Sequence, residues 1–333
     1  MRLVKFLVGL AILVAIAVFA AYQYWQHRLD APIALETAQI YEVPEGAGYH
    51  RVVDELVTRG ILEHRWPYQV LLRLESQSIP ALRAGEFQLE PGMSGRELIA
   101  LLGSNRVVTY TLTVPEGWTF RQMRERLARA PKLAKPGREM SEAQIMAALG
   151  QPGMSPEGWF FPDTYRYRKG VSDLDILKQA FESMQVRLDE IWRERGENLA
   201  IETPYEALIL ASLIERETGA PEERREIAGV FMRRLEKGMR LQTDPTVIYG
   251  LGDDYDGNIT RADLRRPTPY NTYVIEGLPP TPIALPGRAA LEAAVNPKPG
   301  DSLYFVARGD GTHQFSRSLK EHNAAVRKYI LNR

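Results

Sequence analysis

The sequence has 333 residues and no cysteine, and its 42 basic and 42 acidic side chains give a formal net charge of zero. The lack of cysteine excludes disulfides, thiolate metal sites, a cysteine nucleophile and a lipid-modified cysteine anchor. The balanced charge gives no sign of nucleic-acid binding, and an apolar fraction of 44% is that of a globular chain long enough for several domains.

The N-terminus predicts a helix that crosses a membrane once. Residues 1–5 carry two basic side chains, and residues 6–25 are uncharged and long enough to span a bilayer. The basic start favours a cytoplasmic N-terminus with the rest of the chain outside the cytoplasm. A signal peptide cleaved near Ala15–Ala17 is the alternative, but the apolar stretch is longer than a usual signal core. Residues 26–36 are expected to be a linker.

A short pattern recurs three times after the linker, at Val43–Gly46, Leu89–Gly92 and Val114–Gly117. Each copy follows an apolar-alternating stretch and precedes a helical one, which predicts a short strand, a turn and a helix. The first two copies fall in residues 37–108, which we expect to form a small α+β module, and the third falls in a larger domain at residues 109–333. The small module is either a glycan-binding platform or a spacer above the membrane.

The middle of the chain alternates between irregular and helical patterns. Residues 130–156 are rich in proline and glycine and predict a lobe of short helices. Glu157–Tyr165 places three consecutive aromatic side chains, Trp159–Phe161, beside a glycine and a proline, which suits either a core hairpin or a wall on which a sugar stacks. Asp173–Arg195 holds a 3.6-residue apolar period and predicts a long helix.

Thr203–Gly219 predicts a helix with an unusual carboxylate. The capping box and the proline that follows it start the helix, and Gly219 ends it. Glu217 shares a face with Leu213 and Ile214, so it points toward the core, whereas Glu215 lies about 200° around the helix and is expected to be solvated. Burial and the negative end of the helix dipole would both raise the pKa of Glu217.

A carboxyl that keeps its proton near neutral pH is what a general acid for glycosidic bond cleavage requires. The alternative is a helix-end glutamate that extends past the apolar stripe into water. The segment after it favours the acid. A second helix is expected from Glu222 to Gly238, and Met239–Gly250 then forms a loop of hydroxyl, amide and carboxylate groups that suits a sugar. By its chemistry alone, this loop could equally be structural.

The C-terminal third is expected to wrap the two helices with loops at Arg261–Gly287, followed by a hairpin at Leu303–Ser316 and a helix at Ser318–Leu331. None of the five histidines has the spacing of a metal-binding motif, so no metal and no cofactor is expected.

Five motifs together resemble those of the membrane-anchored endolytic murein transglycosylases, the MltG or YceG-like family. They are EGWFFPDTY at Glu157–Tyr165, ASLIERET at Ala211–Thr218, GMRLQTDPTVIYG at Gly238–Gly250, PYNTY at Pro269–Tyr273 and GLPPTPIALPG at Gly277–Gly287. The resemblance extends from the N-terminal anchor almost to the C-terminus. In that family the catalytic acid is the glutamate followed by threonine, which is Glu217 here.

The resemblance implies an α+β fold: an N-terminal transmembrane helix, a LysM-like module, and a mixed α/β catalytic domain with the acid on a helix. It implies a lytic transglycosylase that cuts the bond between N-acetylmuramic acid and N-acetylglucosamine inside nascent strands, leaves 1,6-anhydromuramyl ends and uses no cofactor. Residues expected to bind substrate or orient the acid are Gln242, Thr243, Asp244, Tyr249, Asn271, Tyr273 and Trp159. Asn271 is expected either to bind an N-acetyl group or to form a turn.

The family resemblance also implies an enzyme of the inner membrane, with its catalytic domain in the periplasm and penicillin-binding proteins as partners. Two other functions stay open from the sequence. Asp244 could act with Glu217 in a glycan hydrolase, since ordinary glycosidases use two carboxylates. A membrane-anchored scaffold that binds peptidoglycan without cutting it is the second, and there Glu217 would be structural.

Overall fold

A computed structural model describes residues 1–331 of the chain. The chain divides into two compact units, residues 1–110 with 167–169, and residues 111–166 with residue 170 onward. Each unit is described by itself. Both units contain helices and short antiparallel or isolated strand pairs, which is the expected α+β class.

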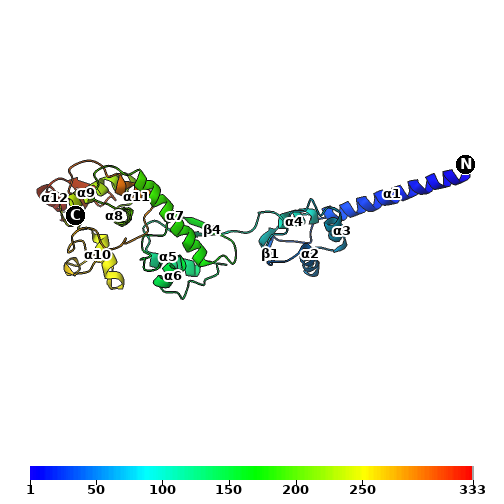
Figure 1. The fold of residues 1–333 in the computed structure, drawn as a ribbon, viewed down its shortest axis with the longest axis horizontal. Helices are drawn as coiled ribbons and strands as arrows, with labels where there is room; N and C mark the ends of the chain where they lie inside the picture. Colours follow the sequence, from blue (N-terminus) through cyan, green and yellow to red (C-terminus); the bar gives the residue numbers. More distant parts are fainter. Residues whose placement is uncertain (332–333) are drawn as a thin grey trace. The chain divides into compact units, whose positions relative to one another are not determined.

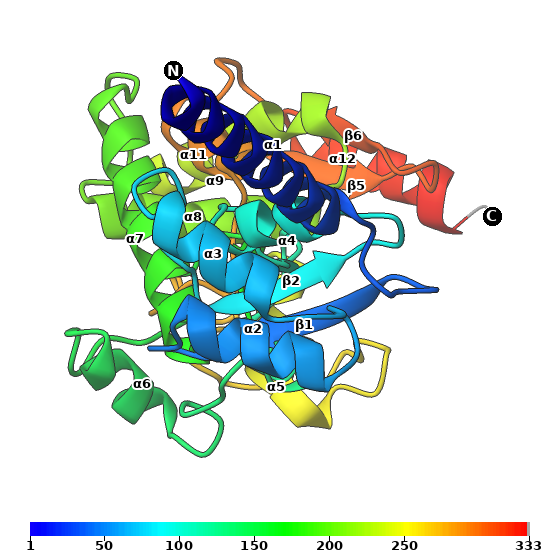
Figure 2. The ribbon, with the colours of Figure 1, turned by 90° about the vertical axis from the view of Figure 1, so that its right-hand side faces the viewer.

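The first unit is a small core of strands and helices preceded by a long helix (Figure 1). Its elements are α1 (Arg2–Asp30), β1 (Gln39–Val43), α2 (Tyr49–Thr58), α3 (Trp66–Leu74), β2 (Gly85–Leu89) and α4 (Gly95–Leu102). Strands β1 and β2 pair antiparallel, and their buried side chains, such as Tyr41 and Phe87, pack with the helices into one apolar cluster. Figure 2 shows α2, α3 and α4 gathered about this strand pair.

Helix α1 is longer than the sequence predicts. An 18-residue window of it has a mean hydropathy of 2.8 and no buried residue, so it is long and apolar enough to cross a membrane. The helix continues to Asp30, however, and Trp25 and Leu29 are buried in the core of the first unit. The indole N–H of Trp25 donates to the carbonyl oxygen of Pro67 at 2.9 Å. The expected linker at residues 26–36 is therefore helical in its first part, because its apolar side chains have a core to enter.

The three strand–turn–helix units are confirmed. Strands β1, β2 and β3 (Tyr110–Thr113) each lead through a glycine with positive φ into α2, α4 and α5 (Phe120–Arg129). These glycines are Gly46, Gly92 and Gly117, with φ of 72°, 80° and 75°. Glycine adopts this left-handed conformation without steric cost, which is why the turn recurs with the same residue.

The second unit is mainly helical. After α5 its elements are α6 (Glu142–Ala148), β4 (Thr164–Tyr167), α7 (Asp173–Arg193), α8 (Pro204–Glu217), η1 (Pro221–Glu223), α9 (Arg224–Glu236), α10 (Asp244–Leu251), η2 (Gly252–Asp254), η3 (Asp263–Arg265), α11 (Arg288–Val295), β5 (Tyr304–Ala307), β6 (His313–Ser316), α12 (Leu319–Val326) and the π-helical turn η4 (Arg327–Leu331). In the part of the chain that the structure describes, its strands form only the pairs β3–β4 and β5–β6.

Helix α8 is the centre of this unit. It contacts α7, α9, α10 and α11, and every residue from Ala207 to Ile214 is buried. A helix that is apolar all round is typical of a core position rather than of a surface with one buried face. The predicted one-sided helix is therefore wrong in this respect, although its start at the Thr203 capping box is confirmed.

Two further helices differ from the expectation. The loop predicted at Met239–Gly250 becomes helix α10 from Asp244 onward, with Thr243 at its N-cap and Pro245 in its first turn. Helix α11 was not predicted, and its alanine-rich face packs closely on α8. Small side chains let the two helices approach, which explains why the short segment is buried.

Candidate active site

Glu217 is the last residue of α8. Thr203 accepts a hydrogen bond from Glu206 N–H at the start of this helix, and Thr218 ends it with an extended backbone at φ −140°. Glu217 is partly buried at the carboxyl end of the helix, where the dipole disfavours a negative charge. The helix thus delivers a carboxyl group to the edge of the core.

The surroundings of Glu217 raise the pKa of its carboxyl. Burial is the main cause, and the charge of Asp244 acts in the same direction. The hydroxyl of Thr243 donates a hydrogen bond to Oε2 of Glu217 and lowers the pKa, as does the charge of His313. The net direction is upward, as the sequence predicts.

Three buried threonines fix the donor to Glu217. Thr243, Thr246 and Thr272 are 1%, 0% and 0% exposed. The amide N–H of Thr243 donates to Oγ1 of Thr272 at 3.0 Å, Oγ1 of Thr246 donates to the carbonyl of Thr243 at 2.7 Å, and the hydroxyls of Thr246 and Thr272 lie 2.8 Å apart. The QTDPT and PYNTY motifs are therefore one hydrogen-bonded unit, and the position of the Thr243 hydroxyl is set by it.

Asp244 and Tyr273 form a second pair beside Glu217. The hydroxyl of Tyr273 donates to Oδ1 of Asp244 at 2.6 Å, and Asp244 is exposed. Burial and this carboxylate raise the pKa of Tyr273, and the charge of Glu217 adds to the effect. Glu217, Thr243, Asp244 and Tyr273 thus belong to one cluster.

Gln242 and Asn271 support loops. Gln242 is exposed and has φ of 51°, and its side-chain oxygen accepts from Arg234 at 3.3 Å. Asn271 is 1% exposed, its amide nitrogen donates to three backbone carbonyls, and its oxygen accepts from Tyr273 N–H at 2.9 Å. These bonds within the protein favour the turn interpretation of Asn271 over binding of an N-acetyl group.

Trp159 and Tyr249 make contacts with other parts of the unit. Trp159 stacks on Tyr205 with ring centroids 5.7 Å apart and also packs against Phe181. Its ring is part of the core, which favours the core interpretation over a stacking wall. The hydroxyl of Tyr249 donates to Oε2 of Glu157 at 3.1 Å.

The prediction that Glu215 is solvated is wrong. Its side chain is 6% exposed rather than solvated, lies 3.7 Å from Nη2 of Arg224, and accepts from Gly287 N–H at 2.9 Å. Burial is the main cause of a raised pKa for this carboxyl. Because α8 is surrounded on all sides, the face opposite Glu217 is also covered.

Two other carboxylates went unnoticed in the sequence. Glu223 accepts from the backbone N–H of His313 at 2.8 Å and lies 2.7 Å from its Nδ1, with both side chains 11% exposed. Glu157 is 6% exposed and accepts from Phe120 N–H at 2.9 Å. Burial raises the pKa of Glu157 to about 7. In the sequence, only the place of Glu157 in the EGWFFPDTY motif could have indicated that this carboxylate matters.

A cavity of about 630 Å³ adjoins this region, and we call it the Glu157 cavity. Each of the five motifs contributes to its lining. The contributing residues are Glu157, Arg216, Pro245, Ile248, Tyr249, Tyr270 and Ile283. Segments far apart in the sequence thus line one cavity. Two of its lining residues, Arg216 and Pro245, are the chain neighbours of Glu217 and Asp244.

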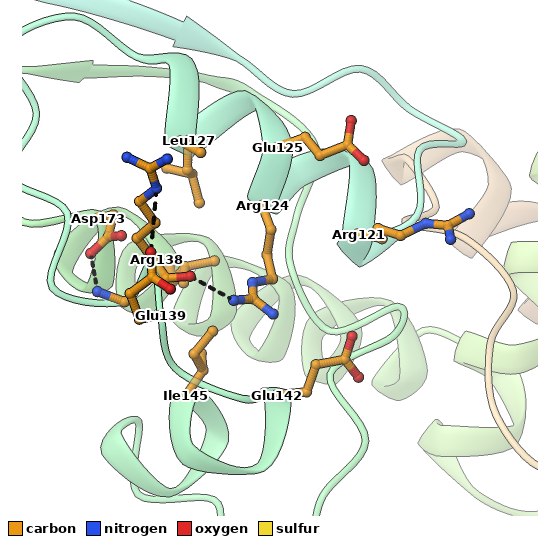
Figure 3. A pocket seen from close by; sticks show the side chains of 12 residues that line it. Arg121, Arg124, Glu125, Leu127, Arg138, Glu139, Glu142, Ile145 and Asp173 are labelled. Atoms are coloured by element: carbon orange, nitrogen blue, oxygen red, sulfur yellow. Dashed lines mark hydrogen bonds and ion pairs between the residues drawn. The ribbon is translucent and has the colours of Figure 1, made fainter.

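Figure 3 shows a different cavity, of about 420 Å³, lined by α5, residues 137–142 and α7. Two of its polar side chains, Arg124 and Asp173, hold the loop at residues 137–140. Arg124 donates to the carbonyl oxygens of Arg138 and Met140, at 3.3 and 2.7 Å, and Asp173 accepts from Gly137 N–H at 3.0 Å. Nothing in this arrangement points to chemistry. Across residues 1–331, no three side chains of metal-binding type come together.

A model of the YceG-like family matches residues 41–328. The chain belongs to the YceG-like family. A Bacillus subtilis relative named endolytic murein transglycosylase is 31% identical over 306 residues, which cover 86% of this chain and 84% of the relative. A Streptococcus pneumoniae protein of the same name is 28% identical, and the match covers 98% of this chain and 65% of that longer protein. The crystal structure of a yceG-like protein from Listeria monocytogenes aligns with a TM-score of 0.56 at 29% identity, over 87% of this chain and all of that one.

Proposed function

We propose that this YceG-like chain is an endolytic murein transglycosylase with Glu217 as its general acid. Relatives that match most of the chain's length carry that name. The observation that carries the proposal is the carboxyl of Glu217, whose pKa is raised at the buried end of α8 while Thr243 donates to one oxygen. A raised pKa favours the protonated carboxyl that a general acid needs to protonate a leaving oxygen.

The reaction follows from one carboxyl group. Because Thr243 donates to Oε2, the proton of the acid sits on Oε1 of Glu217. That proton passes to the oxygen between N-acetylmuramic acid and N-acetylglucosamine as the bond to muramyl C1 breaks. The carboxylate then takes the proton of the muramyl C6 hydroxyl while the oxygen of that hydroxyl bonds to C1. The product is a 1,6-anhydromuramyl end, water is not consumed, and Glu217 ends protonated as it began.

A second carboxylate is not required in this scheme. The nucleophile is held within the same sugar as the reacting carbon, so proximity replaces a nucleophilic side chain. In this proposal Thr243 steadies the carboxylate form of Glu217, Asp244 and Tyr273 contact the substrate at the edge of the cluster, and Gln242 and Asn271 shape the loops.

A hydrolase is the second candidate, and the position of Asp244 favours it. Asp244 is exposed and close enough to Glu217 for its charge to raise the pKa of the acid. An inverting glycosidase uses such a second carboxylate to activate water. Its product would be a reducing end in place of an anhydro end.

We further propose that α1 anchors the enzyme in the inner membrane, with residues 1–5 in the cytoplasm and the second unit in the periplasm. The apolar length of α1 supports an anchor, and Arg2 and Lys5 support the orientation. An anchor at this membrane would bring the enzyme to nascent strands, with penicillin-binding proteins as partners and a LysM-like first unit that contacts glycan or sets the height above the bilayer.

The test is mass spectrometry of purified glycan strands after incubation with the full chain in detergent. Wild type, Glu217→Gln and a control, Glu190→Gln, are compared, where Glu190 is an exposed carboxylate on α7. Wild type and the control are expected to make anhydromuramyl ends inside long strands, and Glu217→Gln none. Reducing ends would support the hydrolase, and ends made equally by Glu217→Gln would refute the assignment of the acid.

A further inference from the structure

The Glu157 cavity lies within the second unit and next to the proposed acid. Its lining includes Arg216, which precedes Glu217, and Pro245, which follows Asp244. An endolytic enzyme binds sugars on both sides of the bond it cuts. Resting on the proposed function, we propose that this cavity seats a sugar residue flanking the scissile bond, and that Glu157 hydrogen-bonds to that sugar.

The cavity has the size and the walls for a sugar. Its volume of about 630 Å³ lies in the range of sites that enclose small ligands, about 300–1,000 Å³. Tyr255 and Tyr270 are partly exposed at its walls, and Ile248 adds an apolar surface. A pyranose offers an apolar face to such rings and hydroxyls to polar groups.

Glu157 keeps hydrogen-bonding capacity for a ligand. It accepts from the N–H of Phe120 at 2.9 Å and from the hydroxyl of Tyr249 at 3.1 Å. The backbone N–H of Gly158 also donates to it. A carboxylate has about four acceptor sites, so these bonds fix its orientation and leave a lone pair for a sugar hydroxyl or acetamido N–H. Since burial raises its pKa to about 7, the group is also able to donate a proton to a sugar oxygen.

The charges favour a neutral sugar over an acidic peptide stem. Glu142 and Glu157 line the cavity together with Arg121 and Arg216, so with Glu157 ionised the lining carries no excess of positive charge. Both arginines are also engaged, Arg121 with Asp253 at 2.5 Å and Arg216 with the carbonyl oxygen of Gly117 at 3.2 Å. An anionic ligand would find no free guanidinium among these lining side chains.

The ion pair between Arg121 and Asp253 joins two sides of the cavity, α5 and the segment after α10. Its side chains are 60% and 85% exposed, and exposed pairs of this kind add little stability. Breaking this pair would therefore cost little stability.

Binding without turnover tests this proposal. The full chain in detergent carries Glu217→Gln. Isothermal titration measures its affinity for a peptide-free murein tetrasaccharide whose lactyl carboxylates are capped as amides, which keeps it neutral, and for the same oligosaccharide bearing peptide stems. Into this background we introduce Glu157→Gln, Tyr255→Ala and the control Glu190→Gln. For the peptide-free sugar, Kd is expected to rise about tenfold with each of the first two changes and to stay constant with the control.

Three results would overturn the proposal. Unchanged affinity for both ligands would mean that the cavity is empty in the complex. Weakening confined to the stem-bearing ligand would assign the cavity to the peptide. Weakening by Glu157→Gln alone, with a lowered melting temperature and with Tyr255→Ala unchanged, would reduce Glu157 to a structural clamp. Because these measurements need no catalysis, a failure of the transglycosylase assay leaves them interpretable.

Discussion

Replacing Glu157 by glutamine should change how the stability of the second unit depends on pH. Burial raises the pKa of this carboxyl from an ordinary 4.5 to about 7 in the folded chain. Between these values the folded protein holds a proton that the unfolded chain has released. Stability contributed by the protonated group is therefore present at low pH and lost as pH rises from 4.5 to 7.

The size of the effect follows from the two pKa values. One unit of difference corresponds to about 1.4 kcal/mol, and integration from pH 5 to pH 8 gives a loss of about 2.5 kcal/mol in the unfolding free energy. For a unit of this size, about 2–4 °C of melting temperature corresponds to each kcal/mol. From pH 5 to pH 8, the melting temperature of the wild type should therefore fall by roughly 5–10 °C more than that of Glu157→Gln.

Thermal unfolding of the full chain, followed by circular dichroism at pH 5 and pH 8, measures the difference. For each protein, the change in melting temperature from pH 5 to pH 8 is measured, and the change for Glu157→Gln is subtracted from the change for the wild type. Other buried carboxyls such as Glu215 titrate in both proteins, so their contributions cancel. The control Glu190→Gln should follow the wild type. Parallel shifts of wild type and Glu157→Gln, within about 1 °C, would refute the burial argument for this group.

Three further changes probe the cluster around Glu217. Thr243→Val removes a donor that lowers the pKa of Glu217, so the alkaline limb of the pH–rate profile should move to higher pH and turnover should fall about tenfold or more. Asp244→Asn removes a charge that raises this pKa, so the limb should move to lower pH with anhydro ends still formed, whereas abolished turnover would support Asp244 as a base. Glu215→Ala leaves Arg224 buried without its partner and should reduce the unfolding free energy by about 3 kcal/mol in a denaturant titration, and an unchanged midpoint would show that the pair contributes nothing.

Local features of the fold were predictable from the sequence because their causes are local. The Thr203 capping box and the proline after it start α8, and the long apolar period of α7 makes it a helix wherever it packs. The three strand–turn–helix units depend on a glycine turn between an alternating and a helical pattern. Each of these signals lies within about ten residues, so no knowledge of the tertiary fold is needed.

What surrounds α8 could not be predicted. The apolar spacing within this helix predicts one buried face and, on that basis, a solvated Glu215. In the structure, α11 covers another side of the helix and Gly287 donates to Glu215. Burial of a given face depends on segments more than 70 residues away, and periodicity within one helix carries no information about them.

The same distinction applies to the site. The helix face and the family motif both selected Glu217, and the motif placed Thr243 and Asp244 near it. Glu157 depends on Tyr249, which is 92 residues later in the chain, and Glu223 depends on His313, which is 90 residues later. Pairings of this kind exist only after the chain has folded, so isolated residues gave no sign of them.

In the proposed mechanism, the cluster around Glu217 lets one carboxyl group act first as an acid and then as a base. A strongly raised pKa would make Glu217 a weak acid that holds its proton, and an ordinary pKa would leave it ionised before the substrate arrives. Burial and Asp244 raise the pKa, while Thr243 and His313 lower it. Thr243 favours the carboxylate through a hydrogen bond that is already in place, so the conjugate base is stabilised as soon as the proton leaves. The opposing influences come from α10 and β6, and their balance, rather than a second carboxylate, is what the proposed reaction requires.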